Sequence, residues 1–212
     1  MGSNVLKRVH TVKDLGILLD NKLRFSEHIA TVTAKAFTIL GIIRRTTQAF
    51  SDVYCLKTLY VSLVRSILEY GVTIWAPYHA VQIARLERVQ KVFIRFALRH
   101  LPWRTDLQLP SYEQRCALID LPTLPKRRKF LQQLLIFDLL NNNLDCSELL
   151  GRLRINAPIR LTRRYDFLRR TTHRTQYGQN NPFAVCCERF NDVYYLFEFD
   201  MSKNVFKIRI RE

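Results

Sequence analysis

Apolar residues recur at intervals of three and four along most of the chain, which is the spacing of one face of an α-helix. This pattern predicts a mainly α-helical fold. Three long helices are expected in the first half, at about 26–50, 52–70 and 81–100, with Ser26 as the N-cap of the first and Ser51 or Asp52 as the N-cap of the second. Caps and breaks predict further helices at about 111–119, 124–142, 147–153, 182–197 and after Ser202, the first of them opened by a capping box of Ser111 and Gln114.

Residues 9–25 follow a different pattern, a short apolar run closed by a turn signal at Asp20 and Asn21. Such a run predicts a strand or a short hairpin. A two-stranded hairpin is too small to be stable by itself. We therefore expect a partner for it upstream of this chain.

The expected elements fall into three parts, which suits a chain of 212 residues. Residues 1–25 form the short hairpin, and 26–104 form a bundle of three helices. Residues 105–212 form a second helical unit that includes an extended basic stretch at 156–174.

The helix expected at 81–100 has the most strongly two-faced pattern in the chain. Leu86 and Phe93 fall on its apolar side, and the opposite arc of about 120° is cationic. This arc holds Arg85, Arg88, Lys91, Arg95 and Arg99. The stripe is either an ordinary solvated face or a surface for phosphates. Neighbouring like charges on a helix cost about 0.2–0.5 kcal/mol per pair, which favours an anionic partner.

The net charge of +16 points the same way, because a strongly basic protein suits a polyanionic partner such as nucleic acid. The excess is uneven. Residues 1–120 and 121–175 each carry a net charge of +8, whereas 176–212 are neutral. The charge is therefore densest in the middle segment.

That segment holds two further basic clusters. Lys126, Arg127, Arg128 and Lys129 begin a helix, where the helix dipole disfavours cations, so a bound phosphate would relieve them. An ordinary solvated basic turn is an equally good interpretation of this cluster. The second cluster consists of Arg160, Arg163, Arg164, Arg169, Arg170 and Arg174. Tyr165, Phe167 and Tyr177 lie among these arginines, and they either stack on bases or pack inside the protein.

The remaining chemistry is sparse. The five cysteines include no Cys-x-x-Cys pair, so we expect free thiols, no disulfide and no metal, even with His173 near Cys186 and Cys187. His28 is interpreted as a structural residue. No apolar stretch is long enough to span a bilayer, and no signal peptide is apparent. The chain is expected to be intracellular, nuclear or cytoplasmic, and not secreted, without cofactor, small-molecule substrate or membrane partner.

Several stretches together resemble the region after the catalytic palm in jockey-like non-LTR retrotransposon reverse transcriptases. They are KDLGILLD (13–20), FSEHI (25–29), LKTLY (56–60), SILEYG (66–71), LPWR (101–104), YEQRC (112–116), RTQYG (174–178) and CERFN (187–191). No single stretch is diagnostic, but their order covers nearly the whole chain.

The resemblance implies a role for each part. Leu15, Gly16 and Ile17 fall on the primer-grip hairpin of such enzymes, and residues 26–100 correspond to the thumb. The rest corresponds to the C-terminal extension. The implied partner is template–primer, as RNA or an RNA–DNA duplex.

The departures from the family matter equally. No two aspartates are adjacent, and no Tyr-x-Asp-Asp motif occurs, whereas two-metal phosphoryl transfer needs clustered carboxylates. The chain is therefore expected to be no enzyme by itself. The alternatives are a helical module that docks on a protein, such as a separate palm, or a genomic relic.

Overall fold

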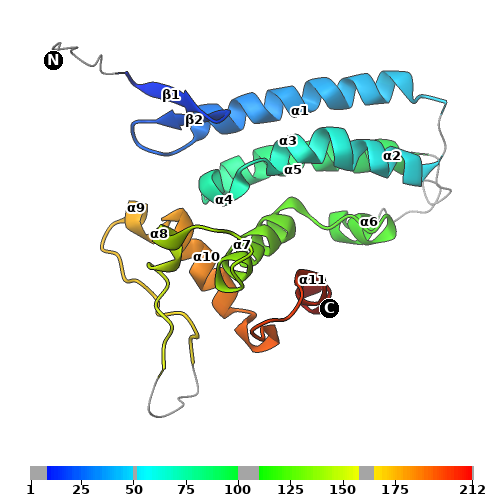
Figure 1. The fold of residues 1–212 in the computed structure, drawn as a ribbon. Helices are drawn as coiled ribbons and strands as arrows, with labels where there is room; N and C mark the ends of the chain where they lie inside the picture. The colour runs from blue at the N-terminus through cyan, green and yellow to red at the C-terminus, as the bar shows by residue number, and fades with distance from the viewer. Residues whose placement is uncertain (1–8, 50–51, 100–109, 158–164, 212) are drawn as a thin grey trace. The chain divides into compact units, whose positions relative to one another are not determined.

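The computed structural model describes residues 9–49, 52–99, 110–157 and 165–211 (Figure 1). Within them the fold is mainly helical, with one short antiparallel hairpin near the N-terminus. The predicted fold class is confirmed at this level. The chain divides into two compact units, which we call unit 1 (Met1–Gly71 and Pro77–Leu124) and unit 2 (Val72–Ala76 and Pro125–Glu212).

In unit 1 the strands β1 (Thr11–Asp14) and β2 (Ile17–Asp20) form the hairpin. Its two turn residues both have positive φ, +43° at Leu15 and +86° at Gly16. Two-residue turns with positive φ match the twist of paired strands, and glycine adopts this conformation without strain. The turn predicted at Asp20 and Asn21 is present and closes β2, where the Leu23 N–H donates to the Asp20 carbonyl at 2.9 Å.

Asp20 organises the segment that leads from the hairpin into the first helix. Its carboxylate accepts hydrogen bonds from the backbone N–H groups of Lys22, Arg24 and Phe25, at 2.9, 3.1 and 2.7 Å. Partial burial opposes ionisation, but these bonds outweigh it and lower the pKa of Asp20. They hold the chain where Phe25 has a left-handed backbone, with φ of +56°.

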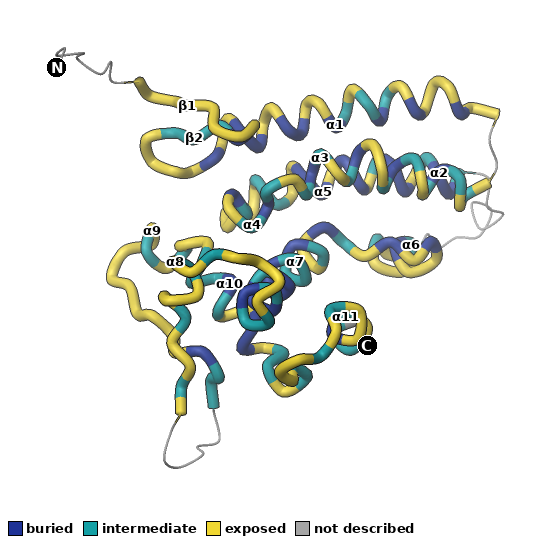
Figure 2. The backbone as a smooth tube through the Cα atoms, in the orientation of Figure 1, coloured by how far each residue is buried: buried dark blue, intermediate teal, exposed yellow. Residues whose placement is uncertain are grey.

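The first long helix, α1 (Ser26–Thr46), is amphipathic, and buried and exposed turns alternate along it (Figure 2). Its core-facing apolar positions are Ile29, Val32, Ala36, Leu40 and Ile43. Ser26 was suggested as the N-cap. It is instead the first helical residue, and its hydroxyl accepts a hydrogen bond from Gln82 at 2.8 Å.

The second long helix continues through three segments, α2 (Val53–Leu59), the π-helical η1 (Tyr60–Arg65) and α3 (Ser66–Glu69). Asp52, one of the two N-cap residues that the sequence indicated, caps it by accepting the Tyr54 N–H at 2.8 Å.

The third helix, α5 (Ala80–Ala97), contacts both α1 and α2. The Phe93 ring of α5 stacks on Tyr60, with ring centroids 4.1 Å apart. Both side chains are buried, which makes this pair a centre of the unit 1 core.

Residues 110–124 complete unit 1. The helix α6 (Tyr112–Leu118) begins with the predicted capping box of Ser111 and Gln114. The buried Gln90 of α5 donates to the Pro122 carbonyl at 3.0 Å, and an ion pair joins Lys57 to Asp120 at 3.1 Å. Because of these bonds, the compact units divide after Leu124 instead of near residue 105.

Unit 2 is built around two helices, α7 (Leu124–Leu140) and α10 (Pro182–Asn191). Short elements complete it: α4 (Val72–Trp75), α8 (Ser147–Leu150), α9 (Gln176–Gln179), the 3-10 turn η3 (Tyr194–Leu196) and α11 (Lys203–Arg211). The helix α4 packs on α10, and its Trp75 is buried. Residues 72–76 were expected within the three-helix bundle but belong to unit 2.

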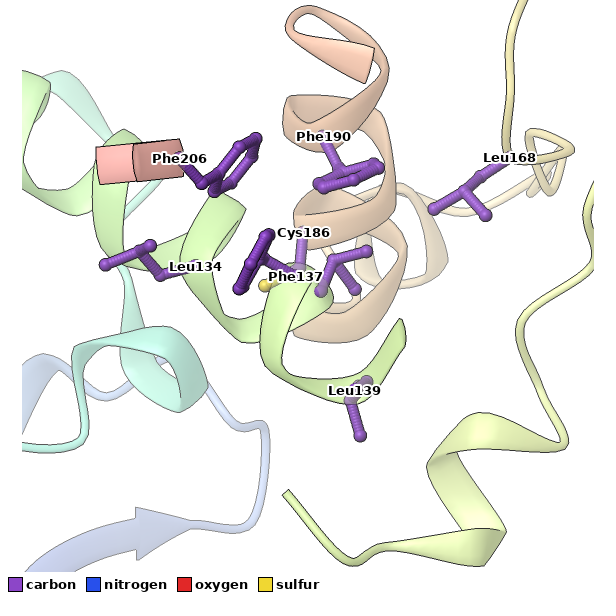
Figure 3. Packing of buried hydrophobic residues seen from close by; sticks show 8 residues of the cluster. Leu134, Phe137, Leu139, Leu168, Cys186, Phe190 and Phe206 are labelled. Carbon is purple, nitrogen blue, oxygen red and sulfur yellow. The ribbon is translucent and has the colours of Figure 1, made fainter. Parts of the chain in front are cut away.

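The core of unit 2 combines phenylalanine rings with leucine and isoleucine side chains (Figure 3). The Phe137 ring of α7 stacks on Phe206 of α11, with centroids 4.4 Å apart, and the ring of Phe190 lies 5.4 Å from that of Phe197. Cys186 is buried in the same cluster, and burial raises the pKa of its thiol to about 12. This cysteine therefore behaves as a core residue.

Candidate functional site

The cationic stripe of α5 is exposed over most of its length. Arg85, Arg88, Lys91 and Arg95 all face solvent. Within the residues that the structure describes, none of these four forms an ion pair. The stripe therefore presents four charges at helical spacing on one face.

The acidic residue of this helix, Glu87, does not neutralise the stripe. Its side chain is 6% exposed, and its carboxylate accepts hydrogen bonds from the Tyr112 hydroxyl and, at 3.4 Å, from the Leu124 N–H. Burial and the bond to Glu87 raise the pKa of Tyr112 well above its ordinary value. Tyr112 thus remains a neutral donor, and Glu87 joins α5 to residues 110–124.

Arg99 departs from the expected stripe. Its guanidinium donates to the carbonyls of Thr47, Gln48 and Phe96, at 3.2, 2.9 and 3.0 Å, and lies 3.9 Å from the centroid of the Phe96 ring. The first two carbonyls follow the C-terminal end of α1, where helices leave acceptors unsatisfied. Arg99 therefore stabilises the fold of unit 1.

The hairpin tip is anchored and partly apolar. The Tyr70 hydroxyl donates to the Leu15 carbonyl at 2.8 Å, whereas the Leu15 side chain is 82% exposed and Ile17 is buried. Beside Gly16 lies an open cavity of about 470 Å³, which His28 and Tyr70 help to line. The three primer-grip-like residues thus differ, because Leu15 alone of them offers a large exposed side chain.

His28 has the structural role that was expected of it. Its Nδ1 accepts the Leu18 N–H at 3.3 Å, which ties β2 to α1. Burial lowers the pKa of His28, so the neutral ring is favoured.

The basic cluster at the start of α7 does not form one surface. Arg128 is buried, Arg127 lies over the Phe130 ring at 5.3 Å, and Lys129 pairs with Asp192 at 2.8 Å. Lys126 is exposed. Three of the four side chains thus have contacts within the fold or are buried.

The stretch at 156–174 is only partly described, and Arg160, Arg163 and Arg164 lie outside the described residues. Arg169 and Arg174 are exposed, whereas Arg170 pairs with Asp166 at 2.8 Å and with Glu188 at 3.6 Å.

Two of the three aromatic residues predicted together with this basic cluster pack inside unit 2. The Tyr165 ring meets Tyr194 edge-on at 5.5 Å, and Phe167 lies 6.0 Å from Phe197. Tyr177 is 61% exposed. Tyr165 and Phe167 are therefore used for packing in this structure, and Tyr177 alone of the three faces solvent.

Unit 2 also contains an open groove of about 710 Å³ that the sequence did not indicate. Its basic lining residues are Arg152, Arg154, Arg169, Arg170 and His173. Arg152 and Arg154 stood outside the predicted clusters because they follow α8 as isolated charges. The only feature of the sequence that could have indicated them is that two arginines stand two positions apart.

Among the described residues, no three His, Cys, Asp or Glu side chains gather closely enough to hold a metal ion. In the same part of the chain, every helix is too short or too polar to cross a lipid bilayer.

Comparison of the whole chain with protein-family models, with curated proteins and with solved structures finds no significant match.

Proposed function

We propose that this chain is the thumb and post-thumb part of a jockey-like reverse transcriptase, and that it grips template–primer without catalysing polymerisation. The observation that carries this proposal is the exposed basic stripe of Arg85, Arg88, Lys91 and Arg95 on α5, which forms no ion pair among the described residues, although Lys91 lies over the Tyr112 ring at 5.1 Å. An RNA–DNA duplex or the element's RNA is the partner.

The spacing of the stripe suits a nucleic-acid backbone. Arg85 and Arg95 are ten residues apart, which is about 15 Å along a helix. At a rise of about 3.4 Å per base pair, this length spans about four base pairs. Three or four phosphates can therefore be contacted at once.

Rigidity strengthens this arrangement. The opposite face of α5 is locked into the core by Leu86, Val89, Phe93 and Ile94, all buried. The arginines need not be ordered through a backbone rearrangement when they bind, so less conformational entropy is lost.

The chain is proposed as non-catalytic because its sequence has no adjacent aspartates and no Tyr-x-Asp-Asp motif. Phosphoryl transfer by two metal ions needs such a carboxylate cluster. In a complete polymerase, an upstream palm would supply it, and this part would position the duplex.

The test is fluorescence anisotropy of the full chain with a labelled RNA–DNA duplex, titrated from about 50 to 200 mM salt. Each phosphate contact adds about one unit to the slope of log affinity against log salt. The variant Arg85→Gln/Arg88→Gln/Arg95→Gln should lower that slope by about three units and weaken binding about tenfold or more at low salt.

The matched control is Lys22→Gln/Arg24→Gln/Lys35→Gln. It removes three exposed charges from the hairpin and α1 side of unit 1 and should keep most of the slope. Equal losses in both variants would show a response to net charge only. No duplex binding at low salt by the unmodified chain would overturn the proposal.

A second candidate is docking on a protein partner, such as a separate palm, through the hairpin. The exposed Leu15 beside the open cavity at Gly16 favours it. Apolar docking should be nearly insensitive to salt, and Leu15→Asp should abolish it, whereas duplex binding by α5 should survive that change.

A further inference from the structure

The groove of unit 2 is assembled from three segments that are distant in the sequence. Arg152 and Arg154 come from the chain after α8, and Arg169 and Arg170 come from the extended stretch. Glu188 of α10 also lines the groove. The groove is therefore a product of the tertiary fold.

Two arginines of the groove lie opposite each other on two paired backbone segments. Ile155 and Leu168 form an antiparallel bridge, and the Arg169 N–H donates to the Arg154 carbonyl at 2.8 Å. Arg154 is therefore directly opposite Arg169, at a separation of about 5 Å between Cβ atoms. Like charges placed opposite one another in this way are destabilising.

The acidic residue of the groove does not relieve this repulsion. Glu188 pairs with Arg170, which also pairs with Asp166. Arg152, Arg154 and Arg169 form no ion pair within the described residues. Three guanidinium groups thus line one groove without an anion to balance them.

Hydrogen bonds hold the two paired backbone segments in place. The buried Asn191 side chain accepts the Leu168 N–H and donates to the Leu168 carbonyl, both at 2.8 Å. Asn156 donates its N–H to the Phe167 carbonyl at 2.8 Å. The backbone that carries the arginines is therefore fixed, and the two segments cannot move apart to relieve the repulsion between the arginines.

We propose that this groove binds the phosphate backbone of single-stranded nucleic acid. Arginine forks match phosphate oxygens in geometry. A volume of about 710 Å³ falls in the range of small-ligand pockets. A double helix, whose major groove alone is about 12 Å wide, is too large to enter.

The spacing of the arginines also favours a nucleic acid over an acidic peptide. Arg154 and Arg169 lie about 5 Å apart across the pairing, and Arg152 lies two positions before Arg154, in the turn after α8. The partner must repeat its charge at short intervals. A nucleic-acid strand does so at every nucleotide, whatever its sequence.

The test is anisotropy of the full chain with a labelled single-stranded oligonucleotide of mixed sequence. The variant Arg152→Gln/Arg154→Gln/Arg169→Gln should lower the salt slope by about two units, since single strands contribute about 0.7 per contact. The control Arg45→Gln/Arg189→Gln/Lys207→Gln removes the same charge outside the groove and should keep most of the slope.

A variant of opposite sign guards against misfolding as the cause. Glu188→Gln removes the carboxylate that competes for the groove and should tighten binding by about threefold. A damaged fold cannot produce tighter binding. Unchanged affinity in both Glu188→Gln and the triple-arginine variant would overturn the proposal.

Competitors separate the sources of phosphate. Unlabelled oligonucleotide should displace the probe, whereas millimolar inorganic phosphate and poly-glutamate should displace it poorly. Displacement by poly-glutamate at equal charge would overturn the assignment to nucleic acid. The α5 variant should keep single-strand binding, so failure of this site and failure of the duplex proposal give different results.

Discussion

The two units carry their basic residues in different ways. In unit 1 the stripe of α5 presents Arg85, Arg88, Lys91 and Arg95 to solvent, while the acid of that helix, Glu87, is buried. In unit 2 several cations have partners within the fold, as Lys129 has Asp192. Three other cations of unit 2, Arg152, Arg154 and Arg169, form no ion pair among the described residues and line one groove. A count of charges therefore says little until each cation is assigned to a structural or an exposed role.

The largest expected effect tests whether the units are stable separately. Phe137→Ala removes the ring that stacks on Phe206 in the core of unit 2, and such truncations cost about 3–5 kcal/mol. Hydrogen exchange measured by mass spectrometry should show faster exchange in α7, α10 and α11. If the units are independent, exchange in α1 and α5 should stay unchanged, and so should duplex affinity.

Loss of protection in both units would contradict that independence. It would mean that the two units unfold together as one cooperative structure. Phe183→Leu is a suitable control, because this partly buried side chain lies at the edge of the same core.

The next effect separates a structural cation from an exposed one on the same helix. Arg99→Gln removes a charged donor from three carbonyls and should lower the free energy of unfolding by about 2–3 kcal/mol. Arg95→Gln should leave stability within about 0.5 kcal/mol, because Arg95 is exposed. Urea unfolding measures both values.

In duplex binding, the Arg95→Gln variant should show the larger effect of the two. Arg95→Gln should reduce the salt slope for duplex by about one unit, whereas Arg99→Gln should leave it nearly unchanged in folded protein. A stable Arg99→Gln variant with weak duplex binding would return Arg99 to the binding surface.

A smaller effect concerns the segment that leads into α1. Asp20→Asn replaces an ionised acceptor of three backbone N–H groups and should cost about 1–2 kcal/mol at neutral pH. Asp14→Asn, at an exposed position in β1, is the control and should cost little.

The effect of pH provides an independent check on Asp20. Because the pKa of Asp20 is lowered in the folded state, its contribution is present above its ordinary value of 3.8 and is lost as pH falls below it. The difference in unfolding free energy between Asp20→Asn and the unmodified chain should therefore shrink in strong acid. A constant difference would assign the loss to packing.

The elements that the sequence predicted well are those whose determinants are local. The apolar spacing of α1, the cap at Asp52 and the capping box of Ser111 and Gln114 lie within single helices. The exposed face of α5 also follows from its own periodicity, so four of its five cations were correctly expected to face solvent.

What the sequence could not indicate depends on partners that are distant along the chain. Arg99 gained a structural role only because Thr47 and Gln48 lie beside it in the fold. The groove required the pairing of Arg154 with Arg169 and the amide of Asn191. Tyr165 and Phe167, candidates for base stacking, instead pack against residues near the C-terminus.

The smallest expected effect distinguishes the two units in mild acid. Burial lowers the pKa of His28 below its ordinary value of 6.5, so the folded state binds this proton less readily than the unfolded state. The stability that neutral His28 provides is therefore complete above about pH 6.5 and declines as pH falls below it. The hydrogen bond from Leu18 to His28 should be lost on protonation, because a protonated Nδ1 cannot accept the Leu18 N–H.

Urea unfolding of unit 1, followed between pH 7 and 5, should show this decline in stability, and His28→Gln should flatten it. Hydrogen exchange corrected for pH should show little change over this range in the hydrophobic core of unit 2, whose cluster of buried residues contains no histidine or carboxylate. Equal acid sensitivity in both units, or an unchanged decline in His28→Gln, would assign the effect to overall charge repulsion in this basic chain.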